Sequence, residues 1–165
     1  MNNILIFWVK KWLHLSSDLV QSQLFDEKTF YEQFMKDLRH CKKEVIIESP
    51  FISSRRMLSL MEIFQKLVDR KIKLYIFTRN PQDHKIDMRL QAESAIRKFE
   101  SMGIQVIIST DKSRRKLAIL DQNILWEGSL NILSQTNSRE YMRRIQSKIH
   151  TQECFKFISL GKYIY

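Results

Sequence analysis

The stretch Ser113–Asn131, which reads SRRKLAILDQNILWEGSLN, organises the rest of the chain. Two apolar runs, Leu117–Leu120 and Ile124–Trp126, are separated by Asp-Gln-Asn. Short apolar runs joined by Asp and Asn predict a β-hairpin. This hairpin would bring Lys116, which precedes the first run, close to the GSLN sequence of residues 128–131, which follows the second. The stretch therefore predicts one site at which two strand ends meet.

The groups that this hairpin brings together suit a phosphate. Lys116 carries an ammonium, Ser129 a hydroxyl and Asn131 a carboxamide, and each of these groups donates hydrogen bonds to anionic oxygens. Gly128 would let the backbone approach an anion without a Cβ in the way. We therefore expect Lys116, Ser129 and Asn131 to bind a phosphate group, and we expect Asp121 to brace the turn rather than to contact substrate.

The spacing Lys-x4-Asp followed by Gly-Ser-x-Asn resembles the phospholipase D superfamily, whose signature is His-x-Lys-x4-Asp and then Gly-Ser-x-Asn. Lys116, Asp121 and the residues GSLN at 128–131 match it, and the words RKLAILD and LWEGSLN are similar to bacterial nuclease-type members. The resemblance covers residues 25–145. It implies an α/β fold, with a mixed β-sheet flanked by helices on both faces, and a metal-independent phosphodiesterase or nuclease activity.

One position departs from that pattern. The signature histidine falls two residues before the lysine, where this chain has Arg114. The resemblance implies that this histidine attacks phosphorus and that a downstream glutamate, Glu140 here, orients it. A guanidinium cannot replace the histidine, because it stays protonated and has no free lone pair. The implied catalytic positions are Arg114 in place of the histidine, Lys116, Asp121, Ser129, Asn131 and Glu140.

We therefore predict a phosphate site that has lost its nucleophile, with an Arg114–Glu140 ion pair in the nucleophile's place. Two alternatives stay open. The domain is an active enzyme that uses His84 or the histidine of a partner chain, or it is a non-enzymatic assembly or membrane-surface module. The family's catalytic unit pairs two signatures, and this chain holds one. We therefore expect a homodimer or pairing with a second phospholipase D-like half.

Composition and net charge indicate which classes of binding partner to expect. The chain has 165 residues, 44% of them hydrophobic, and a net charge of +10, which favours polyanions. We expect nucleic acid, DNA before RNA, with an anionic membrane surface second. Cys41 and Cys154 lack metal-ligand spacing and suggest no disulfide framework, so we expect a reducing cytoplasm, no metal site and no cofactor.

Two loop residues and the N-terminal segment complete the functional candidates. Arg79 follows a strand-like run, where it would either reach a phosphate or pair with a neighbouring carboxylate. His84 follows in the same loop as the candidate replacement base. Residues 1–22 carry the apolar run Ile4–Val9 and then Lys10 and Lys11, and they predict an amphipathic helix that docks on the body or contacts a membrane. We assign 23–165 to the phospholipase D-like domain.

Strand and helix patterns alternate before the hairpin, which is typical of an α/β sheet. Asp26 is expected to begin the first helix, with Phe25 and Phe30 spaced as a hydrophobic staple. The tail is expected to form one weak helix that ends at Gly161. Strands are predicted at 45–47, 73–78, 106–108 and 142–145 beside the hairpin, and helices at 26–41, 54–67, 88–99 and 149–160.

Overall fold

Seven strands form one mixed β-sheet in the computed structural model, which describes residues 21–110 and 113–164. The strand order is β1-β7-β6-β5-β2-β3-β4. β2, β3 and β4 are parallel neighbours, whereas the pairs from β2 through β5, β6 and β7 to β1 are antiparallel. The strands are β1 (Gln21–Asp26), β2 (Glu44–Glu48), β3 (Lys73–Arg79), β4 (Gln105–Ser109), β5 (Leu117–Leu120), β6 (Ile124–Gly128) and β7 (Tyr141–Gln146).

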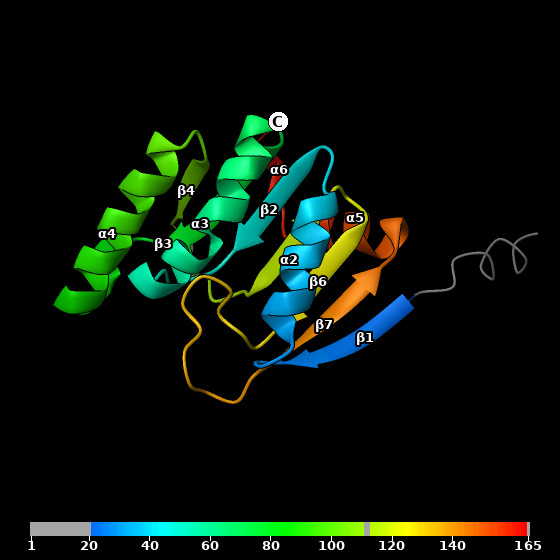
Figure 1. Ribbon diagram of the computed structural model, residues 1–165, viewed down its shortest axis with the longest axis horizontal. Helices are drawn as coiled ribbons and strands as arrows, with labels where there is room; N and C mark the ends of the chain where they lie inside the picture. Colours follow the sequence, from blue (N-terminus) through cyan, green and yellow to red (C-terminus); the bar gives the residue numbers. More distant parts are fainter. Residues whose placement is uncertain (1–20, 111–112, 165) are drawn as a thin grey trace, which may run out of the picture.

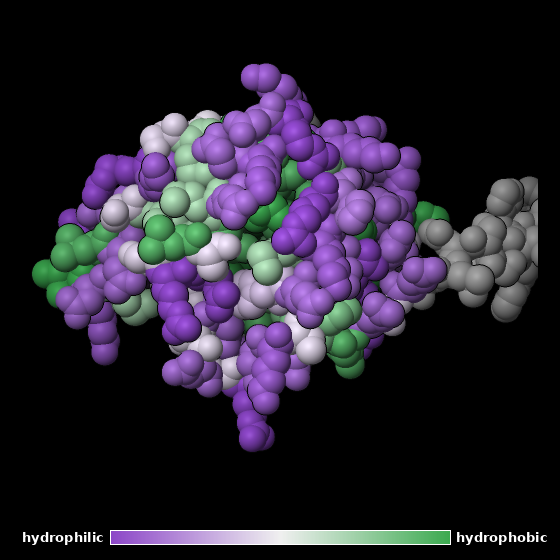
Figure 2. Space-filling model, in the orientation of Figure 1, coloured by the Kyte–Doolittle hydropathy of each residue, from purple (hydrophilic) through white to green (hydrophobic). Residues whose placement is uncertain are grey.

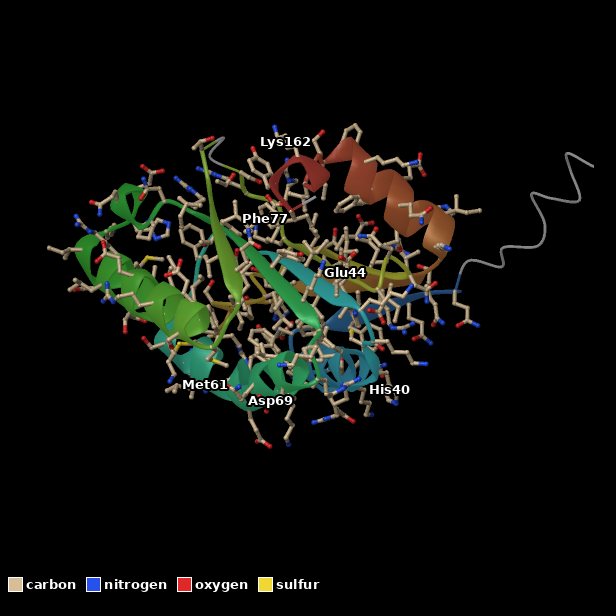
Figure 3. The ribbon with its side chains drawn as sticks, turned by 90° about the horizontal axis from the view of Figure 1, so that it is seen from above. His40, Glu44, Met61, Asp69, Phe77 and Lys162 are labelled. Atoms are coloured by element: carbon tan, nitrogen blue, oxygen red, sulfur yellow. The ribbon has the colours of Figure 1, made fainter. Side chains whose placement is uncertain are left out.

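Helices cover both faces of this sheet, as Figures 1 and 3 show. α2, α3 and α4 lie on one face, and α5 and α6 lie on the other. Met61 of α3 and Lys162 of α6 accordingly appear on opposite sides of the sheet in Figure 3. The predicted fold class is confirmed. The helices are α2 (Phe30–His40), α3 (Ser54–Asp69), α4 (Ile86–Ser101), α5 (Lys148–Phe157) and α6 (Gly161–Ile164), with a short 3-10 helix η1 (Pro81–Asp83).

Two hydrophobic cores sandwich the central strands. Every residue of β2 and of β5 is buried, because helices pack on both faces of these strands. Successive residues of β2 alternate between the cores, with Val45 and Ile47 toward α2 and α3 and Ile46 toward α6. Trp126 is fully buried in the larger core, where its ring centroid lies 5.1 Å from that of Phe30.

The beginning of the described chain differs from the prediction. Phe25 and Asp26 belong to β1, and α2 begins four residues later than expected, at Phe30. The staple is wrong, because Phe25 packs on Trp126 with ring centroids 5.0 Å apart. Asp26 instead accepts hydrogen bonds from the backbone N–H groups of Lys28 and Thr29 in the turn before the helix.

Three further predictions can be compared with the structure. Strand β7 is confirmed, and so is the end of α4 near Gly103, which has φ +89°. The tail is not one helix, because α5 ends at Phe157 and Ser159 has φ 55°. Gly161 begins α6 instead of ending a helix. Residues 1–20, which hold most of the predicted N-terminal helix, lie outside the described residues, and residues 21 and 22 belong to β1.

The face covered by α2, α3 and α4 is mainly hydrophilic, with apolar side chains gathered at the end near α4 (Figure 2). Ile86 and Leu90 of α4 are exposed by 72% and 59%. Within the described residues, no helix is both long and apolar enough to cross a membrane.

Candidate functional site

One edge of the sheet collects most of the predicted site. The three parallel strands end there, and β5 begins there, because β5 runs antiparallel to β2 and pairs Leu117 with Glu48. Leu117 pairs in turn with Glu127 of β6, and Glu127 pairs with Arg143 of β7, so these residues lie at the same end of the sheet. We call this edge, with the loops that leave it, the carboxyl edge. Arg79, Arg114, Lys116, Ser129, Asn131 and Glu140 all lie at the carboxyl edge, whereas Asp121 lies at the other end of β5.

The hairpin brings Lys116 and the GSLN sequence together as predicted. The backbone N–H of Gly128 donates to the carbonyl of Lys116 at 3.3 Å, so the two residues face each other where the strands end. The half-buried Lys116 turns its ammonium back along its own chain, and Nζ donates to the carbonyl of Arg114 at 3.3 Å. Within the described residues the ammonium therefore has one acceptor, and its other N–H groups can donate to an anion.

Gly128 is needed for a reason that the sequence did not show. A Cβ at this position would lie 2.2 Å from the carbonyl oxygen of Tyr141 and 2.9 Å from Cα of Met142. The expectation that this glycine makes room for an anion stays a prediction, and the structure adds a packing requirement. β7 approaches β6 so closely that only glycine fits between them.

Ser129 joins the GSLN sequence to β7. Its backbone N–H donates to the carbonyl of Tyr141 at 3.0 Å, and its Oγ accepts from the backbone N–H of Tyr141 at 3.2 Å. Because the oxygen acts as the acceptor in this bond, the hydroxyl proton can still be donated to a phosphate oxygen. Ser129 is thus both a structural residue and a candidate ligand.

Asn131 has a buried polar atom without a partner. Its backbone carbonyl accepts from the N–H groups of Ser134 and Gln135, at 3.0 and 2.8 Å, and this fixes a tight turn. Its side-chain Oδ1 is buried and makes no hydrogen bond within the described residues. Because Oδ1 is an acceptor, only the Nδ2 group of this side chain could donate to a phosphate oxygen.

The expected Arg114–Glu140 ion pair is not formed. Glu140 accepts a hydrogen bond from the Ser138 hydroxyl at 3.1 Å, and its backbone N–H donates to Glu27 at 3.2 Å. Arg114 is exposed and makes no ion pair within the described residues. β6 lies between β5 and β7, so the pair would have to span two inter-strand spacings, about 10 Å, and the neighbouring Ser138 holds the Glu140 carboxylate instead.

A buried carboxylate beside the motif was missed. Glu48, at the end of β2, is 3% exposed and receives Nε of Arg115 at 2.9 and 3.1 Å. The hydroxyl of Ser113 donates to the same carboxylate. The signal was available, because Glu48 ends a continuous buried strand run, where a carboxylate needs a partner. Arg115 is therefore neutralised, while its neighbour Arg114 faces solvent.

Arg79 lies at the carboxyl edge but is enclosed there. Its side chain is only 14% exposed, and Nη2 lies 3.8 Å from the carboxylate of Asp83. The guanidinium carbon lies 5.9 Å from the ring centroid of Phe51. Of the two roles expected from the sequence, the structure favours the carboxylate partner. Arg79 Nε is nevertheless buried without a hydrogen-bond partner in the described residues.

His84 packs on the same aromatic ring. The ring centroids of His84 and Phe51 lie 4.9 Å apart, and Nε2 of the imidazole is buried without a hydrogen bond in the described part of the chain. Burial lowers the pKa of His84, the charge of Arg79 lowers it further, and Asp83 opposes both. The imidazole is neutral at pH 7, but its buried Nε2 is not positioned to attack a phosphate.

Asp121 performs the structural role predicted for it. Its carboxylate accepts hydrogen bonds from the backbone N–H groups of Lys42, Lys43 and Glu44, at 2.8, 2.8 and 3.0 Å. Asp121 and Gln122 both have φ 53°, which is the backbone of a tight hairpin turn. Asp121 thus anchors the turn to the chain that enters β2, far from Lys116.

Metal ligation has no candidate in the part of the chain that the structure describes. No group of three His, Cys, Asp or Glu side chains is placed to hold an ion there. Cys41 is buried and Cys154 half-buried, and both are free thiols. Burial raises the pKa of Cys41 to about 12 and that of Cys154 to about 11, so both are protonated at pH 7.

Comparison with known families agrees with the hairpin motif. A family model described as "Cardiolipin synthase, PLD-like domain" matches residues 34–158, which is most of the chain. The chain therefore belongs to the phospholipase D-like domain family. No curated protein matches the sequence.

Solved structures share the fold. NucT from Helicobacter pylori aligns with a TM-score of 0.68 and 15% identity over 84% of this chain and 92% of that chain. Nuc from Salmonella typhimurium, a phospholipase D family member, gives a TM-score of 0.68 and 12% identity over 84% and 91%. TrmBL2, an archaeal chromatin protein with a novel mode of DNA binding, gives 0.58 and 14% over 93% and 59%.

Proposed function

We propose that this domain binds the phosphodiester backbone of nucleic acid, DNA before RNA, at the carboxyl edge, and that it cleaves the backbone poorly or not at all. The observation that carries the proposal is the hairpin, which pairs Gly128 with Lys116, so that Ser129 and Asn131 follow at the same end of the sheet as the exposed Arg114. The description of TrmBL2 as a DNA-binding protein of similar fold supports a nucleic-acid partner. The net charge of +10 favours the same polyanion.

The charges of Arg114 and Lys116 explain why the site would hold a phosphate. Glu48 neutralises Arg115, so the anion-binding charge comes from Arg114 and Lys116. The backbone carbonyl of Arg114 already accepts from Lys116 Nζ, which keeps the ammonium close to position 114. A phosphate between the guanidinium and the ammonium would receive hydrogen bonds from both cations, and Ser129 and Asn131 would add neutral donors.

Catalysis is impaired in this proposal because Arg114 takes the place of the family's histidine. A guanidinium keeps its proton at any physiological pH and cannot form a covalent bond to phosphorus. The buried Nε2 of His84 does not favour this imidazole as a replacement nucleophile.

Pairing with a second copy or a similar half belongs to the same proposal. α3 and α4 begin at the carboxyl edge, and their first turns expose Leu58 by 59%, Ile86 by 72% and Leu90 by 59%. Exposed apolar side chains beside a charged end of the sheet suit a protein interface. A symmetric pair would place two copies of Arg114 and Lys116 in one groove, which would strengthen binding to a polyanion.

The test compares binding and cleavage in one set of proteins. The parent chain should bind a DNA duplex at low salt and leave it uncut. Arg114→His should cut the duplex in the presence of EDTA. Arg97→His, on the exposed side of α4, is the matched control and should leave the duplex intact. Rapid cleavage by the parent chain, or absence of DNA retention, would overturn the proposal.

A further inference from the structure

The face of the sheet that carries α5 is covered only in part. α5 and α6 pack over β5 and β6, where Leu117, Ile119 and Leu125 are buried. β1 and the outer side of β7 have no such cover within the described residues. Leu24 of β1 and Tyr141 of β7 are exposed by 61% and 56%. On the opposite face of the same strands, Met142 is fully buried.

A groove beside α5 continues this uncovered surface. Two adjoining hollows of about 440 and about 320 Å³ share the residues Glu127, Cys154 and Phe157. Phe157 is exposed by 87% and Ile149, at the beginning of α5, by 62%. We call the surface formed by Leu24, Tyr141, Ile149, Phe157 and this groove the β1–β7 face. Large apolar side chains gathered on one surface mark a place where another chain segment packs.

We propose that residues 1–20 of this chain cover the β1–β7 face. They join it directly, because Gln21 pairs with Gln146, two residues before α5 begins at Lys148. Figure 3 shows the beginning of β1 beside the first turn of α5. Gln21, which directly follows the segment, therefore lies at one end of the face, so no long connection is needed for the segment to reach it.

Length and charge fit the same occupant. The six residues of β1 span about 20 Å, a length that about thirteen helical residues cover. The apolar run Ile4–Val9, followed by Trp12 and Leu13, supplies large side chains for Leu24, Ile149 and Phe157. Lys10 and Lys11 complement Glu127 and Glu153, which line the part of the groove nearer the first turn of α5, whereas Arg115, Lys116 and Arg143 line the other part.

This occupant would lie next to the proposed phosphate site, because Lys116 and Arg143 line one end of the groove. The interaction is otherwise independent of what the carboxyl edge binds. A second copy, a membrane surface or a nucleic-acid strand on the same face would give different results in the test below.

Quenching of tryptophan fluorescence in the full chain tests whether residues 1–20 contact the β1–β7 face. The chain has three tryptophans, of which Trp8 and Trp12 lie in the segment and Trp126 is fully buried. Docking should shield Trp8 and Trp12 from acrylamide. Leu24→Asp and Phe157→Asp, at exposed positions that the fold tolerates, should each raise acrylamide quenching about twofold as these indoles move into water. Leu58→Asp, at a similarly exposed leucine of α3, is the matched control and should leave quenching unchanged.

Four results would overturn the proposal. One is quenching of the parent chain as strong as that of free indole plus a buried Trp126, and another is quenching that Leu24→Asp and Phe157→Asp leave unchanged. Shielding that disappears on dilution, together with a dimer mass in sedimentation, would assign the face to a second copy. Shielding that arises only with anionic phospholipid vesicles or with added DNA would assign it to that partner. Circular dichroism of each variant verifies that the domain is folded.

Discussion

The two ends of the sheet differ in how completely their buried polar groups are hydrogen-bonded. Toward the edge that holds the hairpin turn, Asp37 accepts from Trp126 Nε1 at 3.0 Å and from Arg144 Nε at 2.7 Å, and Asp121 accepts from three backbone N–H groups. At the carboxyl edge, the buried Glu48 carboxylate also accepts from Ser113 and Arg115, but five other buried polar atoms lack partners in the described residues. These atoms are Arg56 Nε, Thr78 Oγ1, Arg79 Nε, His84 Nε2 and Asn131 Oδ1.

The difference separates stability from binding. Saturated networks such as that of Asp37 hold strands and helices in one arrangement, whereas unsatisfied groups lower stability unless a ligand compensates them. We therefore expect substitutions near the hairpin turn, at the end of the sheet opposite the carboxyl edge, to change the free energy of unfolding. Substitutions at the carboxyl edge should change nucleic-acid binding. Four predictions test that division, from the largest effect to the smallest.

Asp37→Ala should be the most damaging. The change leaves Arg144, whose side chain is 12% exposed, without its carboxylate, and removing one partner of a buried ion pair costs about 3–5 kcal/mol. Urea denaturation measures the loss. Glu32→Ala, which breaks the exposed pair with Lys36, is the control and should cost less than about 1 kcal/mol. Equal losses in the two variants would contradict the division between edges.

Gly128→Ala should affect both properties, because the glycine lies where β7 crowds the motif. Its new Cβ must displace the carbonyl of Tyr141, and overpacking of this kind costs about 1–3 kcal/mol. The displacement also moves Ser129, so DNA retention should weaken. Gly103→Ala has space for its Cβ and strains only its own backbone, so it should lower the urea midpoint without changing DNA retention.

Lys116→Ala should weaken binding and spare stability. Removal of one phosphate contact lowers the slope of log K against log salt by about 1. Titration of a fluorescent DNA duplex at several salt concentrations measures that slope. Lys98→Ala, an equal charge change at the far end of α4, should leave it unchanged. A parallel loss in the two variants would mean that overall charge, not the hairpin site, binds the DNA.

His84 should produce a small dependence of stability on pH. Its folded pKa is lowered below the ordinary value of 6.5, so the unfolded chain binds more protons in the window just below pH 6.5. The free energy of unfolding should therefore fall as the pH decreases from 6.5 toward the lowered folded pKa. Above pH 6.5 the contribution of His84 should stay constant. Urea midpoints of the parent and of His84→Gln should diverge only in that window. A divergence that grows above pH 7 would contradict the assignment.

The sequence predicts the sheet well where neighbours along the chain decide the structure. Continuous apolar runs identified β2, β3, β4 and the hairpin, and Asp121 and Gln122 have the positive φ angles of a tight hairpin turn. β1 escaped prediction, because QSQLFD has only two apolar residues and acquires its strand form from pairing with β7. An edge strand of this kind is defined by its partner rather than by its own pattern.

In the candidate site, too, contacts between neighbours along the chain were predictable, and contacts between distant segments were not. The meeting of Lys116 with Ser129 follows from hairpin register and was predictable. The missing Arg114–Glu140 pair depends on β6 lying between β5 and β7, and the true partner of Glu140 is the local Ser138. The pairing of Arg115 with Glu48, and the enclosure of Arg79 by Phe51, join segments far apart in sequence that no spacing rule connects.

The attachment of Ser113 and Arg115 to one carboxylate of β2 has an evolutionary consequence. The residue between them is fixed at both flanks and contributes no packing of its own, so position 114 can change identity at little thermodynamic penalty. A lineage could lose or regain chemistry there in a single step while its scaffold stays intact. Inactive and active descendants of one ancestor would then differ in reactivity and not in fold.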